Sequence, residues 1–198
     1  MLKEDKLVIA TNNAHKVREI KAIISERFGG IESMAEAGIN LDVEETGSTF
    51  TENAVLKAVA VAKAAGCWAL ADDSGICVDA LGGAPGVYSA RWSGLGDQGN
   101  NEKLMAEMAG RQNRAAHYAC AMALANPDGF VLTAEGRCEG IIGTEPKGHR
   151  GFGYDPYFIV EEYGCAMAEL PDEVKNSISH RKRALEALIT RMGEVGLE

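Results

Sequence analysis

The stretch Cys67-Trp68-Ala69-Leu70-Ala71-Asp72-Asp73-Ser74-Gly75 decides how this chain is organised. Its first part, residues 67–71, is an uncharged apolar run, which predicts a strand buried within a sheet. The run Asp72-Asp73-Ser74-Gly75 is then expected to end that strand. Neighbouring side chains of an extended chain point to opposite faces, so one aspartate can bind a metal ion or water while the other is held in the structure.

Strands and helices alternate on the N-terminal side of this stretch. A short apolar run over 7–10 predicts a strand, and apolar residues recur at helical spacing over 14–28. A further strand is expected within 31–41. Thr49-Phe50-Thr51-Glu52 matches a capping box, so a second helix should begin there and end at Gly66. The many alanines of that helix should let it pack closely against a sheet.

The C-terminal half mixes hairpins with helices. Strands over 117–125 and 130–139 are expected to pair antiparallel across the turn Asn126-Pro127-Asp128-Gly129. The other expected elements are extended chain over 76–81, a helix over 100–108, a strand over 157–160 and a final helix from Ser179 or His180. Together the two halves predict an α/β protein with a mixed sheet and flanking helices rather than a purely doubly wound sheet.

Length and charge restrict the possible functions. The chain has 198 residues, too few for two full-sized enzymes, so we expect a single domain over 1–198. Lys plus Arg number 20 and Asp plus Glu number 29, and the net charge of −9 argues against nucleic acid or anionic lipid as a general partner. A locally basic site for a phosphorylated small molecule stays compatible with that charge.

The cysteines and the apolar segments suggest where the protein works. The five cysteines form no C-x-x-C pair and most lie in apolar runs, so we interpret them as reduced core thiols, with a catalytic thiol as the alternative. The N-terminal residues show no signal-peptide pattern, and no uncharged apolar stretch approaches the roughly 18 residues of a spanning helix. We therefore expect a cytoplasmic protein without a membrane partner.

Several common nucleotide-binding and hydrolase motifs are missing from the sequence. It contains no G-x-x-x-x-G-K-[ST], no H-E-x-x-H and no G-x-S-x-G. The run Gly94-Leu95-Gly96-Asp97-Gln98-Gly99 does match G-x-G-x-x-G by its letters. No clear buried strand precedes it, however, and Asp97 would bring a carboxylate to any pyrophosphate, so we interpret the run as a flexible loop.

Two segments of the N-terminal half are candidates for binding phosphate and metal. Thr11-Asn12-Asn13-Ala14-His15-Lys16 lies at the start of a predicted helix, where backbone N–H groups and a lysine favour anions, although an N-cap and a solvated lysine explain it equally well. Adjacent Asp72 and Asp73 favour Mg²⁺, and a turn with an aspartate cap is the alternative. Glu44 and Glu45 could supply a further carboxylate or form a solvated loop.

The C-terminal half contains an aromatic loop and a basic helix start. Arg150-Gly151-Phe152-Gly153-Tyr154-Asp155-Pro156 could let a base stack on an aromatic face, or its two aromatic residues could belong to the core. His180-Arg181-Lys182-Arg183 resembles a nucleic-acid patch by its charge, but on an acidic chain we interpret it as a charged helix face. A phosphate loop, a carboxylate site and an aromatic slot together suit a nucleotide polyphosphate.

These motifs, in this order, resemble the non-standard purine NTP pyrophosphatase family, whose members hydrolyse inosine and xanthosine triphosphates and their deoxy forms. The most specific part is Ala71-Asp72-Asp73-Ser74-Gly75 followed by Gly82 to Arg91, GGAPGVYSAR. The resemblance implies an elongated mixed α/β fold of two lobes, an active site in the cleft between them, a homodimer and a Mg²⁺ cofactor. The implied reaction converts a purine nucleoside triphosphate and water to the monophosphate and pyrophosphate.

The resemblance also implies roles for individual residues. Asp73 would be the catalytic acid and a metal ligand, and Glu44 a second metal ligand. The residues implied to bind substrate are Thr11, Asn12, Asn13, Ala14, His15, Lys16, Ser74, Phe152, Gly153, Tyr154, Asp155, Lys175, His180 and Arg181. Arg91 is a further phosphate candidate, whereas the role of Asp72 stays open. A non-catalytic nucleotide sensor and a phosphatase or pyrimidine-directed pyrophosphatase are the rival hypotheses.

Overall fold

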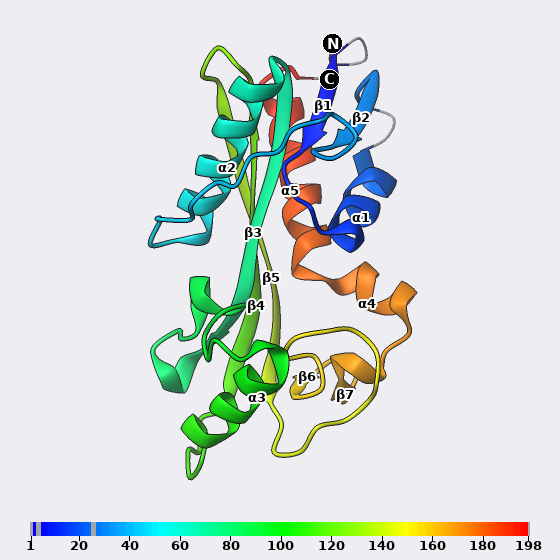
Figure 1. Cartoon of the computed structure of the whole chain (residues 1–198). Helices are drawn as coiled ribbons and strands as arrows, with labels where there is room; N and C mark the ends of the chain where they lie inside the picture. Colours follow the sequence, from blue (N-terminus) through cyan, green and yellow to red (C-terminus); the bar gives the residue numbers. More distant parts are fainter. Residues whose placement is uncertain (1, 3–4, 25–26, 198) are drawn as a thin grey trace. The chain divides into compact units, whose positions relative to one another are not determined.

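The computed structural model in Figure 1 describes residues 2, 5–24 and 27–197. Its internal contacts divide the chain into two compact units. Unit 1 consists of Met1–Asp73, Cys120–Gly136 and Arg181–Glu198, and unit 2 of Ser74–Ala119 and Arg137–His180. The chain therefore first passes from unit 1 to unit 2 within the run Asp72-Asp73-Ser74-Gly75, between Asp73 and Ser74.

The described residues form strands and helices that alternate as far as residue 125, after which further strands and then two helices follow one another. The strands are β1 (Lys6–Ile9), β2 (Gly30–Ser33), β3 (Trp68–Val78), β4 (Ala115–Ala125), β5 (Val131–Ile142), β6 (Phe158–Val160) and β7 (Cys165–Ala166). The α-helices are α1 (Ala14–Ile24), α2 (Phe50–Ala65), α3 (Gly96–Glu107), α4 (Asp172–Ile178) and α5 (His180–Glu194), and short 3₁₀ turns cover Asp79–Leu81, Gly86–Tyr88 and Met167–Glu169. Among these helices, none combines the length and the hydrophobicity of a membrane-spanning segment.

The strands confirm the predicted mixed α/β class. Over the described residues they hydrogen-bond in the order β2-β1-β3-β4-β5-β6-β7. The pairs β1–β2 and β1–β3 are parallel, whereas β5–β6 and β6–β7 are antiparallel. The link between β4 and β5 is too short for a crossover, so these neighbouring strands form the predicted hairpin.

Within unit 1, the alternation of side chains along the strands separates two apolar clusters. Leu7, Ile9 and Leu70 pack with the apolar sides of α1 and α5, whereas Val8 and Ala69 pack with α2 on the other side (Figure 1). The second cluster consists mostly of alanines, which confirms that α2 packs closely against the sheet. Thr49 and Glu52 form the predicted capping box, and Gly66 ends α2 in a left-handed conformation.

Unit 2 has a core of its own, built from β3, α3, β4, β5 and the segment that contains β6, β7 and α4. Its largest fully buried side chains are Ile76, Leu104, Met108, Ile142, Phe158 and Met167. The cysteines of both units are free thiols that are buried or half-buried, in agreement with the predicted core role. Burial raises the pKa of the Cys120 thiol far above its ordinary value, which argues against a nucleophilic role for it.

The structure corrects two boundaries that matter for function. The run Asp72-Asp73-Ser74-Gly75 does not end the strand but lies inside β3, because the aspartates find side-chain partners there. The run Gly94–Gly99 is not a flexible loop, since α3 begins at Gly96. In addition, β2 is shorter than the strand expected within 31–41, and α4 was not predicted.

Gly75 marks a close approach inside unit 2. A Cβ atom on Gly75 would overlap with Ser89 Oγ and lie 2.5 Å from the carbonyl oxygen of Gly86. The Ser89 hydroxyl is held there because it accepts a hydrogen bond from Ile76 N at 2.9 Å and donates to Gly86 O at 2.6 Å. The absence of a side chain at Gly75 therefore lets the loop around Ser89 pack directly on β3.

We expect Gly75→Ala to lower the free energy of unfolding by about 1–3 kcal/mol, because the methyl group overpacks this contact. Gly30→Ala is the matched control in another strand, where the new Cβ would meet only Lys6 Cγ at 4.0 Å. That control should change stability by less than about 0.5 kcal/mol. Urea unfolding monitored by circular dichroism measures both variants, and equal stabilities would contradict the role of Gly75.

Candidate functional site

Asp72 is the buried centre of an ion network in unit 1. Its Oδ2 accepts hydrogen bonds from Lys16 Nζ at 2.8 Å and from Arg181 Nε at 3.3 Å. Arg181 Nη1 also donates to Glu19 Oε2 at 2.7 Å. Through these contacts one carboxylate on β3 fixes a lysine from the first turn of α1 and an arginine from the first turn of α5.

The charge of Asp72 is set by this network. Burial by itself raises the pKa of the carboxyl group, but the positive charges of Lys16 and Arg181 outweigh it and hold the pKa well below its ordinary value. Burial lowers the pKa of Arg181, and the attraction of Asp72 more than reverses that effect. Asp72 is therefore ionised, and it is the aspartate of the pair that is held in the structure.

Asp73 meets different partners, as expected for the next residue of a strand. Its Oδ2 accepts a hydrogen bond from Asn53 Nδ2 at 3.0 Å, and its Oδ1 lies 3.9 Å from Lys57 Nζ. Burial raises the pKa of Asp73, and Lys57 and Asn53 only partly oppose that rise. The two adjacent aspartates thus differ in chemistry: one is locked as an anion, and the other is poised to take up a proton or a positive charge.

Helix α2 presents the partners of Asp73. Asn53 and Lys57 are separated by four residues and so lie on one face of the helix. Asn53 is 0% exposed, and its Oδ1 accepts a hydrogen bond from Gly47 N at 2.8 Å, which orients the amide toward Asp73. Neither residue was assigned a role from the sequence. Their signal was two polar residues at helical spacing within a helix otherwise rich in alanine.

A second carboxylate shares the ammonium group of Lys57. Glu45 Oε1 accepts from Lys57 Nζ at 2.6 Å, and its negative charge contributes to the raised pKa of Asp73. Glu45 is half-buried, whereas Glu44, which the resemblance assigns to the metal, is exposed. The structure therefore brings Glu45 rather than Glu44 into the electrostatic surroundings of Asp73.

This arrangement of carboxylates fits a divalent cation. Among the described residues no group of three or more His, Cys, Asp or Glu side chains is arranged to hold a metal. Mg²⁺ in phosphate chemistry, however, needs only one or two protein carboxylates, because water and substrate phosphates supply its other ligands. Burial and the negative charge of Glu45 raise the pKa of Asp73, and a bound cation would oppose both effects.

The segment Thr11–Lys16 forms the start of α1 and shows the predicted capping. Asn13 Oδ1 accepts from Lys16 N at 3.3 Å, and Thr11 Oγ1 accepts from Asn13 N at 3.2 Å. Asn12 is exposed, and Ala14 is the first residue of the helix. The side chain of His15 lies outside the described part of the structure. Capping and phosphate binding remain compatible, because the positive end of the helix dipole is at this loop.

In unit 2, Asp155 gathers the residues predicted to bind the base. This buried carboxylate accepts from Lys175 Nζ at 2.6 Å, from Phe152 N at 3.0 Å and from Tyr118 OH at 3.1 Å. The ring of Tyr118 also stacks on His180, with centroids 5.0 Å apart and planes 14° from parallel. Tyr118 was not anticipated from the sequence, where it appears as one more strand residue.

The two aromatic residues of the loop 150–156 separate into different roles. Tyr154 is buried and donates from its hydroxyl to Ser89 O at 2.8 Å, so it belongs to the core of unit 2. Phe152 is 57% exposed, and Lys175 Nζ lies 5.0 Å from its ring centroid. Of the two readings of this loop, core residues or a stacking surface, the first holds for Tyr154, whereas Phe152 offers an aromatic face to solvent.

The other residues predicted to form the site are divided between unit 1 and unit 2. Asp73, Arg181 and the segment 11–16 belong to unit 1, whereas Ser74, which is half-buried, lies in unit 2 with the aromatic loop. Arg91, the further phosphate candidate, is placed over the ring of Tyr88 at 5.4 Å. The structure thus assembles an acidic and basic cluster within unit 1 and an aromatic cluster within unit 2. The location of an active site between the lobes stays a prediction.

Comparison with known proteins agrees with the resemblance that the motifs suggested. The chain is 49% identical over 185 residues to the dITP/XTP pyrophosphatase of Bacillus subtilis (strain 168), covering 91% of this chain and 93% of that protein. It is 47% identical to the dITP/XTP pyrophosphatase of Geobacter sulfurreducens, with 98% and 99% covered.

Solved structures lead to the same family. The Ham1 protein of Staphylococcus aureus superposes with a TM-score of 0.88 at 39% identity, over 96% of this chain and 99% of that one. A HAM1 protein from Coxiella burnetii also gives a TM-score of 0.88, at 40% identity over 96% and 98%. The sequence also matches the sequence model of the Ham1 family over residues 7–191. On these grounds, the chain belongs to the Ham1 family.

Proposed function

We propose that this protein hydrolyses non-standard purine nucleoside triphosphates, namely ITP, dITP and XTP, to the nucleoside monophosphate and pyrophosphate. The observation that carries the proposal is the contrast between neighbouring Asp72 and Asp73, one locked by two cations and the other buried with a raised pKa. Such a pair provides a fixed anchor for cations and a proton acceptor side by side. The close relatives named dITP/XTP pyrophosphatase support the choice of reaction.

The cations of unit 1 suit a triphosphate chain. Lys16 and Arg181 each donate to Asp72, but an ammonium group has three N–H donors and a guanidinium group five. Each can therefore keep its bond to Asp72 while donating to a phosphate oxygen. Because Asp72 holds both side chains in place before substrate binds, little conformational entropy is lost when the phosphates arrive.

Asp73 is the group we assign to the chemical step. Its carboxylate is oriented by the hydrogen bond from Asn53 Nδ2, and it can accept the proton of a water that attacks the α-phosphorus. Lys57, 3.9 Å away, stabilises the negative charge that builds up on the phosphate oxygens. The bond between the α-phosphorus and the bridging oxygen then breaks, and pyrophosphate leaves.

The cofactor we assign is Mg²⁺, held by Asp73 and Glu45. When bound, the ion supplies positive charge that neutralises phosphate oxygens and lowers the pKa of water. Glu45 is preferred over Glu44 because it is half-buried on Lys57 beside Asp73. The homodimer implied by the resemblance and the cytoplasmic location expected from the cysteines and the N-terminal residues stay predictions.

Unit 2 provides the means to recognise the base. Phe152 offers an exposed ring for stacking, and Asp155 holds Lys175 at 2.6 Å beside it. Hypoxanthine and xanthine carry an acceptor oxygen at C6, which suits donors such as Lys175 or His180, whereas adenine carries a donor amino group there. A site built from hydrogen-bond donors rejects a mispaired donor strongly. Guanine must be rejected at its 2-amino group.

We expect the purified protein to release pyrophosphate from ITP and XTP with a kcat/KM at least about 100-fold above those for ATP and GTP. Separate assays for pyrophosphate and orthophosphate with Mg²⁺ test this. In ¹⁸O-labelled water the label should enter the monophosphate and not the pyrophosphate. Binding without hydrolysis would instead indicate a nucleotide sensor, and release of orthophosphate a phosphatase.

The two aspartates should respond differently to the same conservative change. Asp73→Asn should lower kcat for ITP by roughly 10²–10⁴-fold with unfolding unchanged, because it removes the proton acceptor. Asp72→Asn should lower the free energy of unfolding by about 3–5 kcal/mol, because Arg181 and Lys16 lose their buried counter-charge. Kinetics and urea unfolding of both variants measure this. Near-normal turnover by Asp73→Asn would remove that residue from its role.

Removal of divalent metal should abolish hydrolysis of ITP, and readdition of Mg²⁺ should restore it. The physical reason is that the carboxylates of Asp73 and Glu45, which share only the single positive charge of Lys57, repel the substrate phosphates when no divalent cation is bound. Glu45→Gln should raise the Mg²⁺ concentration needed for half-maximal rate by about tenfold, whereas Glu44→Gln serves as the matched control. The opposite ranking of the two variants would return the assignment to Glu44.

A further inference from the structure

We propose that Asp97 and Asn101 of α3 form a clamp that positions the loop carrying Phe152 and thereby sets selectivity for the purine base. This inference rests on the proposed function. Both residues contact the same glycine: Gly153 N donates to Asp97 Oδ2 at 2.8 Å, and Gly153 O accepts from Asn101 Nδ2 at 2.8 Å. The backbone N–H and C=O of one residue are thus held by two side chains of one helix.

The clamp depends on the residue at which α3 begins, because the helix starts at Gly96 rather than at residue 100 as expected. Asp97 lies in the first turn of this helix, and Asn101 follows four residues later on the same face. A carboxylate in the first turn is also favoured by the helix dipole. The run Gly94–Gly99, which looked like a nucleotide-binding fingerprint, therefore has a different use: its aspartate binds a peptide group of the protein rather than repelling a pyrophosphate.

The helix that presents the clamp is itself anchored in unit 2. Asn100, which is buried, donates from Nδ2 to the carbonyl oxygens of Ser89 and Ala90, each at 3.2 Å. Its Oδ1 accepts from Ser93 N and Ser93 Oγ, both at 2.8 Å. Tyr154 OH also donates to Ser89 O, so α3 and the aromatic loop are both anchored on the same carbonyl oxygen.

Gly153 is where the loop needs such support. It adopts a left-handed conformation, with φ of 62°, between exposed Phe152 and buried Tyr154. The residues after it are fixed by burial, whereas Phe152 is held on its other side by the hydrogen bond from its N–H to Asp155 Oδ2 at 3.0 Å. The clamp therefore fixes the peptide that links the stacking residue to the core.

Fixing this peptide has a consequence for recognition. A stacked base is discriminated by hydrogen bonds at its edge only if the ring beneath it keeps one position. A mobile Phe152 would still stack on purines, but it would lose conformational entropy on binding and would accept shifted bases. Asp97 and Asn101 are thus positioning residues, and their loss should affect substrate affinity and selectivity more than the chemical step.

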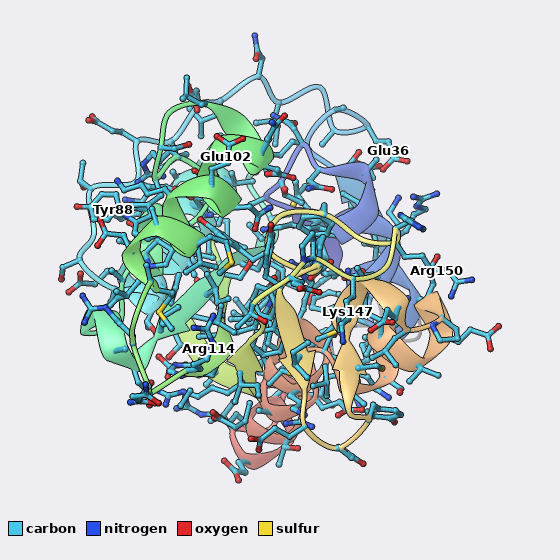
Figure 2. The ribbon with its side chains drawn as sticks, turned by 90° about the horizontal axis from the view of Figure 1, so that it is seen from below. Glu36, Tyr88, Glu102, Arg114, Lys147 and Arg150 are labelled. Atoms are coloured by element: carbon cyan, nitrogen blue, oxygen red, sulfur yellow. The ribbon has the colours of Figure 1, made fainter. Side chains whose placement is uncertain are left out.

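The test compares Asp97→Ala, Asn101→Ala and the double variant with two controls. Gln98→Ala changes a neighbouring exposed residue of the same helix, whose Nε2 donates to Glu102 rather than to the loop (Figure 2 labels Glu102 on α3). Asp97→Asn keeps an oxygen that can accept from Gly153 N. The measurements are amide hydrogen exchange of peptides covering 150–156, kcat and KM for ITP, the ratio of kcat/KM between ITP and GTP, and thermal unfolding.

In the double variant we expect faster exchange over 150–156, a KM for ITP raised about tenfold, a kcat within about twofold of wild type and an ITP-to-GTP ratio lowered about tenfold. Each single alanine variant should show part of these changes, and both controls should behave as wild type. The hydrogen-exchange measurement needs no substrate, so it reports on the clamp independently of the enzyme's reaction.

The clamp would be overturned by unchanged exchange over 150–156 in the double variant, by equal changes in Gln98→Ala, or by faster exchange with unchanged KM and selectivity in an enzyme active on ITP. A loss of kcat together with a large fall in the unfolding temperature would also overturn it, because that indicates general destabilisation. A wild-type protein that leaves ITP intact would overturn the proposed function instead. Hydrogen exchange over 150–156 would then be the measurement that tests the clamp.

Discussion

A charged carboxylate inside a protein must be compensated, and much of unit 1 follows from that requirement at Asp72. The group is buried in a strand, where an isolated charge would be strongly unfavourable. Lys16 and Arg181 compensate its charge from two helices that are far apart in the sequence. The consequence is that two cations are fixed in position before any ligand binds. A structural need of the fold therefore produces an arrangement that is suited to a polyphosphate.

The neighbouring carboxylate shows how a strand can separate two roles. Asp73 faces α2, where a buried amide and a lysine leave its pKa raised instead of lowered. No loop or domain movement is needed to make the two groups different, because the side-chain direction of an extended chain changes at every residue. The chemistry of unit 1 thus depends on which face of β3 each residue occupies.

Local rules predicted much of this fold. The capping box at Thr49, the alanine-rich face of α2 and the hairpin around 126–129 depend on residues close in sequence, and the structure contains all of them. The strand was expected to stop at Asp72 because charge normally ends a buried strand. That expectation was wrong, since the partners that neutralise the charge are Lys16 and Arg181, 56 and 109 residues away.

The candidate site was predictable in part for the same reason. Motif resemblance assigned roles to Asp73, Phe152 and Lys175, but it assigned none to Tyr118 or Asn53, whose roles depend on contacts across the fold. Asp97 was interpreted as evidence against nucleotide binding, although its carboxylate in fact holds the backbone of Gly153. Long-range hydrogen bonds of this kind leave no periodic signal in one sequence.

The position of the acidic pair in the middle of β3 restricts how the chain can change in length. Loops on either side can gain or lose residues, because their ends need only reach the next element. Inside the strand, one inserted residue would exchange odd and even positions and turn every later side chain to the opposite face. Two inserted residues would restore that parity but displace the groups along the sheet. The number of residues in this part of β3 therefore cannot change without displacing the acidic pair or its neighbours.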